Sequence, residues 1–215
     1  MPKINRPGLS DEIVAARNYL GKFSREYART VRPNSHTLET GSSHLPPITY
    51  RHLLGSIMYA LDPVPRKDEE YAARLKRVLT GKRILELGAR RGVFIDFLRK
   101  HGAEAEGIDA NDSAASVARE RGVPVHTGKI EDLTNKKFDL VVSFQFFDPG
   151  YWGVKKTTEI ARNAARLLLR KGHGIHVVLN HESTIERSEL ENAGLRVLKH
   201  EAIEPDLHVS IAQKR

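Results

Sequence analysis

Two patterns of hydrophobic and polar positions divide the chain. In the first part, apolar residues recur every three or four positions, which is typical of one face of a helix. This spacing predicts a helix from Ser10 to about Thr30, and two more over about Tyr50–Leu61 and Lys67–Leu79. A polar, turn-rich segment at 32–48 separates the first two. Residues 1–80 are therefore predicted to form a helical extension, which acts as a lid, acts as a dimerisation arm or simply packs against the rest of the chain.

From Gly81 onward, short apolar segments alternate with amphipathic ones. Strands are predicted at Arg83–Leu87, Ala105–Asp109, Val123–Thr127, Phe138–Phe144 and Gly174–Asn180. Helices are predicted between them at about Val93–His101, Ser113–Arg121 and Thr157–Arg170. This alternation with short joints is typical of right-handed βαβ units, which build a parallel sheet.

The alternation ends near the C-terminus. After a predicted helix at about Thr184–Ala193, two strands follow one another at Leu195–Ile203 and Leu207–Gln213, with Pro205-Asp206 as the turn. Consecutive strands with a tight joint pair antiparallel. The predicted fold of residues 81–215 is therefore α/β, with a seven-stranded, mainly parallel sheet that closes in a C-terminal antiparallel hairpin.

Composition narrows the possibilities further. The 215 residues are 40 % hydrophobic and include no cysteine, which removes disulfides, thiolate metal sites and cysteine nucleophiles. No apolar segment is long enough for a membrane span or a signal peptide, so we expect a soluble, cytoplasmic protein. The net charge is +8, and its excess is densest in residues 1–80. We interpret this as an ordinary basic protein, with nucleic-acid binding as the alternative.

The segment from Ile84 to Phe94 carries the most chemical information. A strand ends at Gly88, a glycine-bearing turn follows, and a helix opens at Gly92. Such a turn lets a ligand approach the backbone and the free N–H groups of the helix. A dinucleotide fingerprint needs glycine at Arg90 and Val93, so a nicotinamide site is disfavoured, and no P-loop sequence follows.

Four segments, taken in order, resemble the class I S-adenosylmethionine-dependent methyltransferases. Glu86-Leu-Gly-Ala-Arg-Arg-Gly92 is similar to the first motif of that family, and Gly107-Ile-Asp109 places an acid at the end of the second strand. Gly128–Leu133 resembles the turn after the third strand, and Phe138–Ser143 resembles the fourth strand. The resemblance covers the chain from about Gly81 to its end and implies a Rossmann-like fold with S-adenosylmethionine as cofactor.

The resemblance also implies roles for individual residues. Asp109 would accept hydrogen bonds from the ribose hydroxyls, and Ile130 would donate its backbone N–H to the adenine. The turn would pass under the amino-acid part of the cofactor, and the end of the fourth strand would lie near the methyl group. The implied cofactor-binding residues are Glu86, Gly88, Ala89, Gly92, Asp109, Ala110, Ile130, Ser143 and Phe144.

Two residues depart from the family pattern. Arg90 replaces a glycine common in the first motif, so its side chain could point away, pair with the cofactor carboxylate or block the site. Lys129 stands where many relatives have an acid that accepts from the adenine amino group, a bond that lysine cannot accept. Either Glu131 replaces that acid, or the adenine contact is weaker.

The loop after the fourth strand, Gln145–Trp152, is rich in aromatic residues and has no Lys or Arg. We predict that Phe147, Tyr151 and Trp152 line an apolar pocket for the methyl acceptor. A polynucleotide would need cations as well as stacking aromatics. The loop therefore favours a small-molecule acceptor over nucleic acid.

His181 follows the fifth predicted strand and is the candidate general base for an oxygen nucleophile. The histidines lack the spacing of a metal site, so no metal is predicted.

The sequence thus predicts a methyltransferase acting on a small molecule. One alternative is an RNA methyltransferase, if the basic residues of the first third of the chain gather on one face. Another is a cofactor-binding relative without activity, if Arg90 fills the cleft. The basic residues are Arg17, Lys22, Arg25, Arg29 and Arg32.

Overall fold

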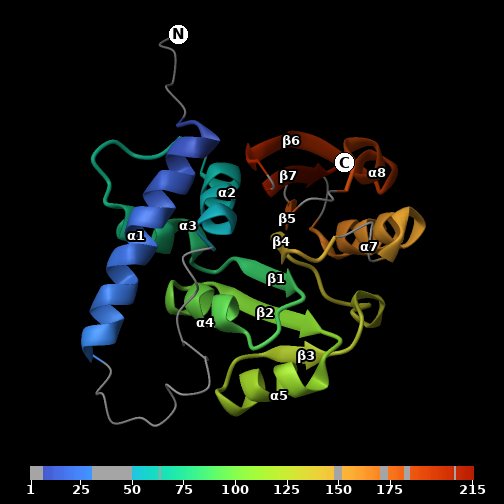
Figure 1. Cartoon of the computed structure of the whole chain (residues 1–215), viewed down its shortest axis with the longest axis horizontal. Helices are drawn as coiled ribbons and strands as arrows, with labels where there is room; N and C mark the ends of the chain where they lie inside the picture. The colour runs from blue at the N-terminus through green and yellow to red at the C-terminus, as the bar shows by residue number, and fades with distance from the viewer. Residues whose placement is uncertain are drawn as a thin grey trace. The chain divides into compact units, whose positions relative to one another are not determined.

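One seven-stranded sheet forms the larger part of the protein in a computed structural model of the chain (Figure 1). The residues that this structure describes are 7–30, 50–62, 64–147, 152–169, 174–181, 185–205 and 207–215. The chain divides into two compact units, Met1–Val78 and Leu79–Arg215. Whether residues 1–80 act as a lid stays a prediction.

The N-terminal unit is helical. Its helices are α1 (Leu9–Thr30), α2 (Arg51–Leu61) and α3 (Tyr71–Leu79). The first two approach each other at Gly55, where an added Cβ would lie only 2.7 Å from the Cα of Ile13. Because that space is filled by the backbone of α1, glycine is required for this close packing.

A buried ion-pair network joins α1 to α3. Arg74 donates from Nη1 and Nη2 to the two carboxylate oxygens of Glu12 at 3.0 and 2.8 Å, and from Nε to Asp62 at 2.7 Å. Arg74 and Glu12 are both buried. Losing Arg74 would leave the buried carboxylate of Glu12 uncompensated, so the pair fixes how these helices meet.

The sheet of the second unit has the order β3-β2-β1-β4-β5-β7-β6. The first five strands are parallel, and β7 pairs antiparallel with both β5 and β6. This confirms the predicted mainly parallel sheet with its C-terminal hairpin. The strands are β1 (Arg83–Leu87), β2 (Glu104–Asp109), β3 (Val125–Thr127), β4 (Leu140–Phe144), β5 (Ile175–His181), β6 (Leu195–Glu204) and β7 (Leu207–Lys214).

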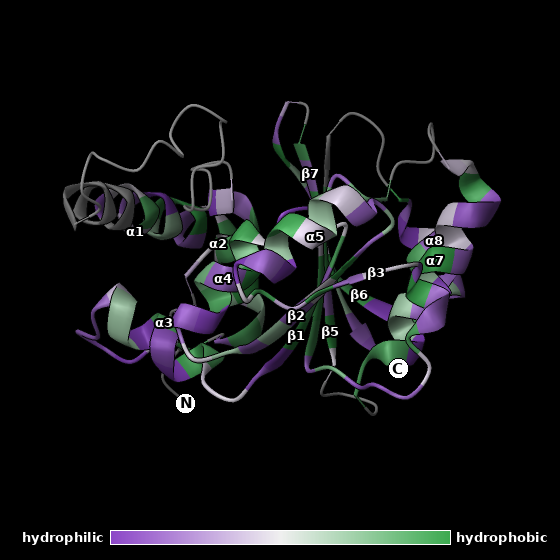
Figure 2. Ribbon diagram, turned by 90° about the horizontal axis from the view of Figure 1, so that it is seen from below, coloured by the Kyte–Doolittle hydropathy of each residue, from purple (hydrophilic) through white to green (hydrophobic). Residues whose placement is uncertain are grey.

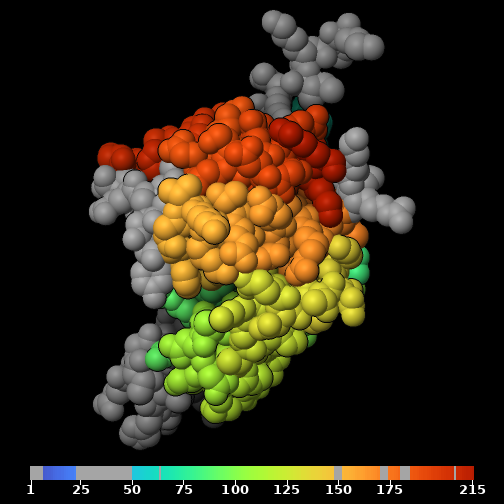
Figure 3. All heavy atoms as spheres, turned by 90° about the vertical axis from the view of Figure 1, so that its right-hand side faces the viewer, coloured from blue at the N-terminus to red at the C-terminus, as the bar shows by residue number. Residues whose placement is uncertain are grey.

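Helices cover both faces of this sheet (Figure 2). On one side lie α4 (Val93–Lys100) and α5 (Asp112–Glu120), and on the other α7 (Val154–Leu167) and α8 (Arg187–Asn192). Figure 3 shows the second side, with α7 in orange beside the β3–β4 connection in yellow. Side chains of β1, β4 and β5 form one hydrophobic core with α7 and α8. This shared core fixes the positions of the strand ends relative to one another.

The observed ends of several elements differ from the predicted ones. The fourth strand begins at Leu140, because Phe138 instead forms a bridge with Leu168. This bridge also ends α7 early, since Leu168 adopts an extended conformation. The third strand begins after Pro124, which has no N–H to donate to a neighbouring strand.

His176 in β5 is a polar residue in an apolar position. It is fully buried, and neither ring nitrogen has a hydrogen-bond partner among the described residues. Its ring packs edge-on against Phe147, with the ring centroids 5.2 Å apart. Burial lowers the pKa of His176 to about 3, so the imidazole is neutral in the folded protein near neutral pH.

We expect acid to destabilise the wild-type protein more than His176→Leu. The folded-state pKa of about 3 lies below the ordinary value of 6.5, so the unfolded chain binds the proton more tightly. Stability therefore falls as the pH drops from 6.5 towards 3, by up to about 1.4 kcal/mol per pH unit from this group. Urea unfolding at several pH values measures the difference, with the exposed His126→Leu as control. A difference that does not change with pH would contradict the buried neutral state.

Candidate functional site

The turn after β1 has an unusual backbone. Gly88, Arg90 and Gly92 all have positive φ, at 71°, 48° and 66°. Glycine adopts this region freely, whereas for arginine it costs about 1 kcal/mol. The N–H groups of Gly88 and Ala89 both donate to the carbonyl of Ile108, at 2.9 and 3.2 Å. These bonds attach the turn to the end of β2.

The close approach of the turn to β2 explains why position 107 is a glycine. Ala89 is buried on Gly107, and a Cβ at Gly107 would overlap the Cβ of Ala89. Glycine at this position therefore lets the turn lie directly on β2. The sequence motif includes Gly107, but its role in supporting the turn becomes clear only from the register of β1 and β2.

Asp109, the last residue of β2, binds the turn through its side chain. Its Oδ2 accepts from the N–H of Arg90 at 2.7 Å, and its Oδ1 accepts from the N–H of Asn111 at 2.8 Å. A carboxylate offers about four lone-pair sites, so each oxygen can accept another bond. Ala110 is exposed between these contacts. Asp109 can thus hold the turn and still accept hydroxyl groups of a ligand.

Arg90 presents its backbone, and not its guanidinium, to Asp109. The residue is exposed, and its side chain makes no hydrogen bond or ion pair within the part of the chain that the structure describes. The Arg90 guanidinium is therefore not held in place by any of the described protein groups.

Two buried polar groups near the same strand ends lack partners. Glu86 Oε2 and Ser143 Oγ have no hydrogen-bond partner among the described residues. Burial, and then the charge of Asp109, raise the pKa of Glu86 well above its ordinary 4.5. Ser143 aligns with Leu87 across the β1–β4 pair, so it projects from the opposite face to Glu86. Buried groups of this kind mark places where a ligand or water would complete the bonding.

The turn after β3 lies against the same site. Gly128 donates its N–H to the carbonyl of Asp109 at 3.0 Å. The short 3-10 helix η3 (Ile130–Asp132) follows, with Ile130 buried at its start. The N–H of Lys129 donates to Asp132 at 2.8 Å, which fixes the direction of this turn.

Glu131, the candidate replacement for the acid that Lys129 displaces, is paired with a lysine of α7. Its carboxylate accepts a hydrogen bond from Lys156 Nζ at 2.9 Å. Partial burial raises the pKa of Glu131, but the hydrogen bond and charge of Lys156 outweigh it and lower the pKa overall. The carboxylate is therefore held towards α7.

Aromatic residues follow β4 at the same edge. Phe144 is partly exposed, and the ring of Phe146 lies on Gly88, where an added Cβ would be 2.9 Å from its Cδ2. Trp152 is 39 % exposed and donates from Nε1 to the carbonyl of Phe146 at 2.9 Å. Phe146 was not among the predicted site residues, although it stands in the predicted aromatic loop.

The structure corrects one predicted pocket residue and leaves others untested. Phe147 is fully buried in the hydrophobic core, so it does not line an acceptor pocket. Tyr151 lies outside the described residues. His181 is the last residue of β5 and not part of a loop, and its backbone pairs with Leu207. The side chains of His181, Arg25 and Arg29 lie outside what the structure describes, as does Arg32 altogether.

Comparison with known proteins agrees with this geometry. A family model for the methyltransferase domain matches residues 65–207. The chain belongs to this methyltransferase family. Together with the strand order and the turn after β1, the match makes it a class I S-adenosylmethionine-dependent methyltransferase domain. S-adenosylmethionine is accordingly its cofactor.

Individual relatives are more distant. A ubiquinone biosynthesis O-methyltransferase of Alkalilimnicola ehrlichii is 29 % identical over 120 residues, which are 52 % of this chain and 47 % of the relative. The methyltransferase chain thus spans about half the length of this curated relative.

Among the helices that the structure describes, none is long and apolar enough to cross a membrane.

Solved structures share the fold. A TehB-like S-adenosylmethionine-dependent methyltransferase from Corynebacterium glutamicum has a TM-score of 0.54 and 19 % identity, over 69 % of this chain and 90 % of that one. Magnesium protoporphyrin IX methyltransferase from Synechocystis, with bound SAH, has a TM-score of 0.52 and 12 % identity, over 74 % and 92 %. At these identities the likeness concerns the fold alone.

The residues at the carboxyl edge fit the cofactor. Asp109 retains acceptor capacity for ribose hydroxyls, and the unpartnered Oε2 of Glu86 suits a cationic group. Within the described segments, no group of three His, Asp or Glu side chains is placed to hold a metal ion.

We expect Glu86→Gln to stabilise the cofactor-free protein but weaken S-adenosylmethionine binding. A raised folded-state pKa means that the carboxylate disfavours folding, so stability is lost as the pH rises above 4.5 through the folded-state pKa. Glutamine is neutral, so it removes this loss of stability, but it also removes the negative charge that would bind the ligand. Calorimetric unfolding and cofactor titration test this, with the exposed Glu104→Gln as control. Lower stability at neutral pH would indicate a purely structural glutamate.

Asp109→Asn should weaken cofactor binding about ten-fold or more. Hydrogen bonds to a charged acceptor contribute about 1.5–3 kcal/mol, and asparagine has one neutral acceptor oxygen. Titration calorimetry with S-adenosylmethionine measures the change. Asp139→Asn is the matched control, because its carboxylate also accepts a backbone N–H, from Arg83, at the opposite edge of the sheet. Equal affinities for wild type and Asp109→Asn would contradict the assignment.

Proposed function

We propose that the protein transfers the methyl group of S-adenosylmethionine to a hydroxyl of an apolar small molecule. The observation that carries this proposal is the exposed apolar surface beside the turn. Trp152 and Val154 are 39 % and 61 % exposed, and Trp152 is bonded to the carbonyl of Phe146, whose ring lies on Gly88. The hydroxyl acceptor is suggested by the curated relative, an O-methyltransferase.

When bound, S-adenosylmethionine supplies an electrophilic methyl group. The chain contributes binding and alignment at the carboxyl edge of the sheet. Asp109 would accept the ribose hydroxyls with its remaining lone pairs, while its present bonds keep the turn in place. Glu86 would face the cationic amino-acid end, where a positive charge lowers its pKa again. Most of the rate advantage would come from alignment and removal of water.

The acceptor would be held by the aromatic surface next to Gly88. Trp152 and Phe146 have their ring centroids 6.3 Å apart, at 50° to each other. Two such rings offer apolar contact to an organic molecule, and the Trp152 N–H is already used within the protein. We infer that specificity here depends on shape and apolar contact.

His181 would take the proton from the acceptor hydroxyl. It is the last residue of β5, whose carboxyl end lies at the same edge as that of β4. An imidazole has a suitable pKa for this role near neutral pH. The base matters only for an acceptor that is protonated at the working pH.

The charges that follow β4 favour this function over methylation of a nucleic acid. The first cations after β4 are Lys155 and Lys156, and Lys156 is paired with Glu131. That arrangement gives little support to a nucleic-acid track at this edge.

Trp152→Ala tests the acceptor surface. We expect its KM for an apolar hydroxyl acceptor to rise about ten-fold, or ~1.4 kcal/mol, with the affinity for S-adenosylmethionine unchanged. Release of the demethylated cofactor, measured over a panel of phenolic and aliphatic alcohols, identifies substrates and gives KM. Leu198→Ala, which removes another exposed apolar side chain on β6, is the control. Methylation of RNA but of no panel compound would overturn the proposal.

A further inference from the structure

One crossover in the parallel sheet lacks an α-helix. The connections from β1 to β2, β2 to β3 and β4 to β5 contain α4, α5 and α7, whereas β3 and β4 are joined by the three-residue η3 and a loop. Crossover helices normally cover the faces of a parallel sheet. Beside this short connection, at the amino ends of β1 and β2, lies a groove of about 730 Å³.

The groove lies at the opposite edge of the sheet from Asp109. It is lined by Arg83 and Glu104, which begin β1 and β2, and by Phe138, which precedes β4. The five residues of β1 separate the two edges by about 13 Å, at roughly 3.3 Å per residue. The volume of the groove is within the range of small-molecule sites. The groove is therefore separate from the candidate methyl-transfer site.

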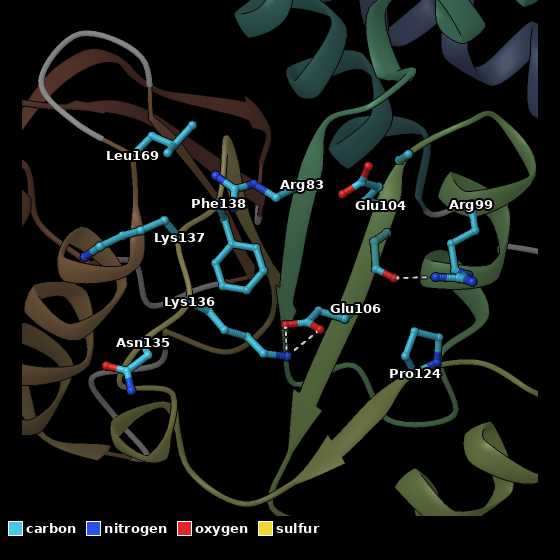
Figure 4. Close-up of a pocket in the computed structure, with 12 residues that line it drawn as sticks. Arg83, Arg99, Glu104, Glu106, Pro124, Asn135, Lys136, Lys137, Phe138 and Leu169 are labelled. Carbon is cyan, nitrogen blue, oxygen red and sulfur yellow. Dashed lines mark hydrogen bonds and ion pairs between the residues drawn. The ribbon is translucent and has the colours of Figure 1, made fainter.

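The charges of the groove are not balanced. Lys136 is neutralised by Glu106, since its Nζ lies 2.7 Å from both carboxylate oxygens (Figure 4). Three further cations line the groove, and Glu104 is the remaining acid among its lining residues. The nearby Asp139 is already bonded by the Arg83 backbone N–H and lies 3.9 Å from Lys82. The lining therefore carries an excess of two positive charges.

The three further cations use little of their bonding capacity. Arg99 donates one hydrogen bond, to the carbonyl of Ala105 at 3.4 Å, and Lys137 donates to the carbonyl of Arg166 at 2.6 Å. The guanidinium of Arg83 makes no hydrogen bond or ion pair within the described part of the chain, and Figure 4 shows it beside Phe138. Neutral carbonyl groups leave these positive charges uncompensated.

We propose that this groove binds a small molecule bearing a phosphate monoester, with Arg83 and Lys137, which lie on the same side of the sheet as α7, as its cationic groups. Such a phosphate carries about −1.5 to −2 charges near pH 7, which matches the excess of the lining. Guanidinium groups bind phosphate oxygens in pairs of parallel hydrogen bonds. A polynucleotide is a poorer match, because Phe138 is only 3 % exposed and offers no ring face for stacking.

Titration calorimetry with phenyl phosphate tests this site in the full-length chain. We expect phenyl phosphate to bind, phenol not to bind, and Arg83→Gln to weaken the affinity about ten-fold or more. The control Lys155→Gln removes an exposed cation from α7, outside the groove. Affinity for S-adenosylmethionine should be the same in all three proteins, which also shows that the variants fold.

The remaining outcomes would overturn the proposal. These are no binding of phenyl phosphate, equal weakening by Arg83→Gln and Lys155→Gln, or competition between phenyl phosphate and S-adenosylmethionine. Binding of generic single-stranded RNA that depends on Arg83, without binding of phenyl phosphate, would identify a nucleic-acid surface instead. If Arg83→Gln loses cofactor binding, Lys137→Gln decides the question by the same criteria. The proposal does not depend on the identity of the methyl acceptor.

Discussion

The candidate site depends on the attachment of one turn to the end of the neighbouring strand. Ala89 packs on Gly107, and the carboxylate of Asp109 accepts the N–H of Arg90. These contacts hold the arginine at positive φ, which it would not adopt by itself. The backbone of the turn, the acid and the buried carboxyl of Glu86 thereby come to one edge of the sheet. Every role proposed for the cofactor-binding residues requires this arrangement.

The strands were largely predictable from the sequence, because a buried strand is visible as an apolar segment. Their order in the sheet was not predicted and comes from the structure. The acid at position 109 was predictable for a related reason, since it stands at a strand end after a glycine-bearing turn. The role of Gly107 was not, because it depends on the register that sets this glycine against Ala89. Phe147 was assigned to the pocket because of its loop position, but the core beside His176 encloses it.

The long-range ion pair of the N-terminal unit could not be predicted from the sequence either. Glu12 and Arg74 are 62 positions apart, and each looks like an ordinary charged residue on a helix. Periodicity places residues on a face, but it does not say which opposite charge the face will meet. The environment of Glu86 has the same origin: its raised pKa follows from complete burial and from the nearness of Asp109. Both are tertiary properties.

The two edges of the sheet are linked through β1. Arg83 begins this strand at the groove, and Glu86 lies near its other end at the cofactor site. The residues between them, Ile84 and Leu85, are completely buried and hydrogen-bonded on both sides to neighbouring strands. A rigid, paired strand of this kind has no second arrangement available for a ligand at one end to favour. The short β3–β4 connection contacts both regions, through Lys136 at the groove and through the turn at Gly128 beside Asp109. Strand β2 likewise runs from Glu104 in the groove to Asp109 at the cofactor site, so the two regions share both β2 and this connection.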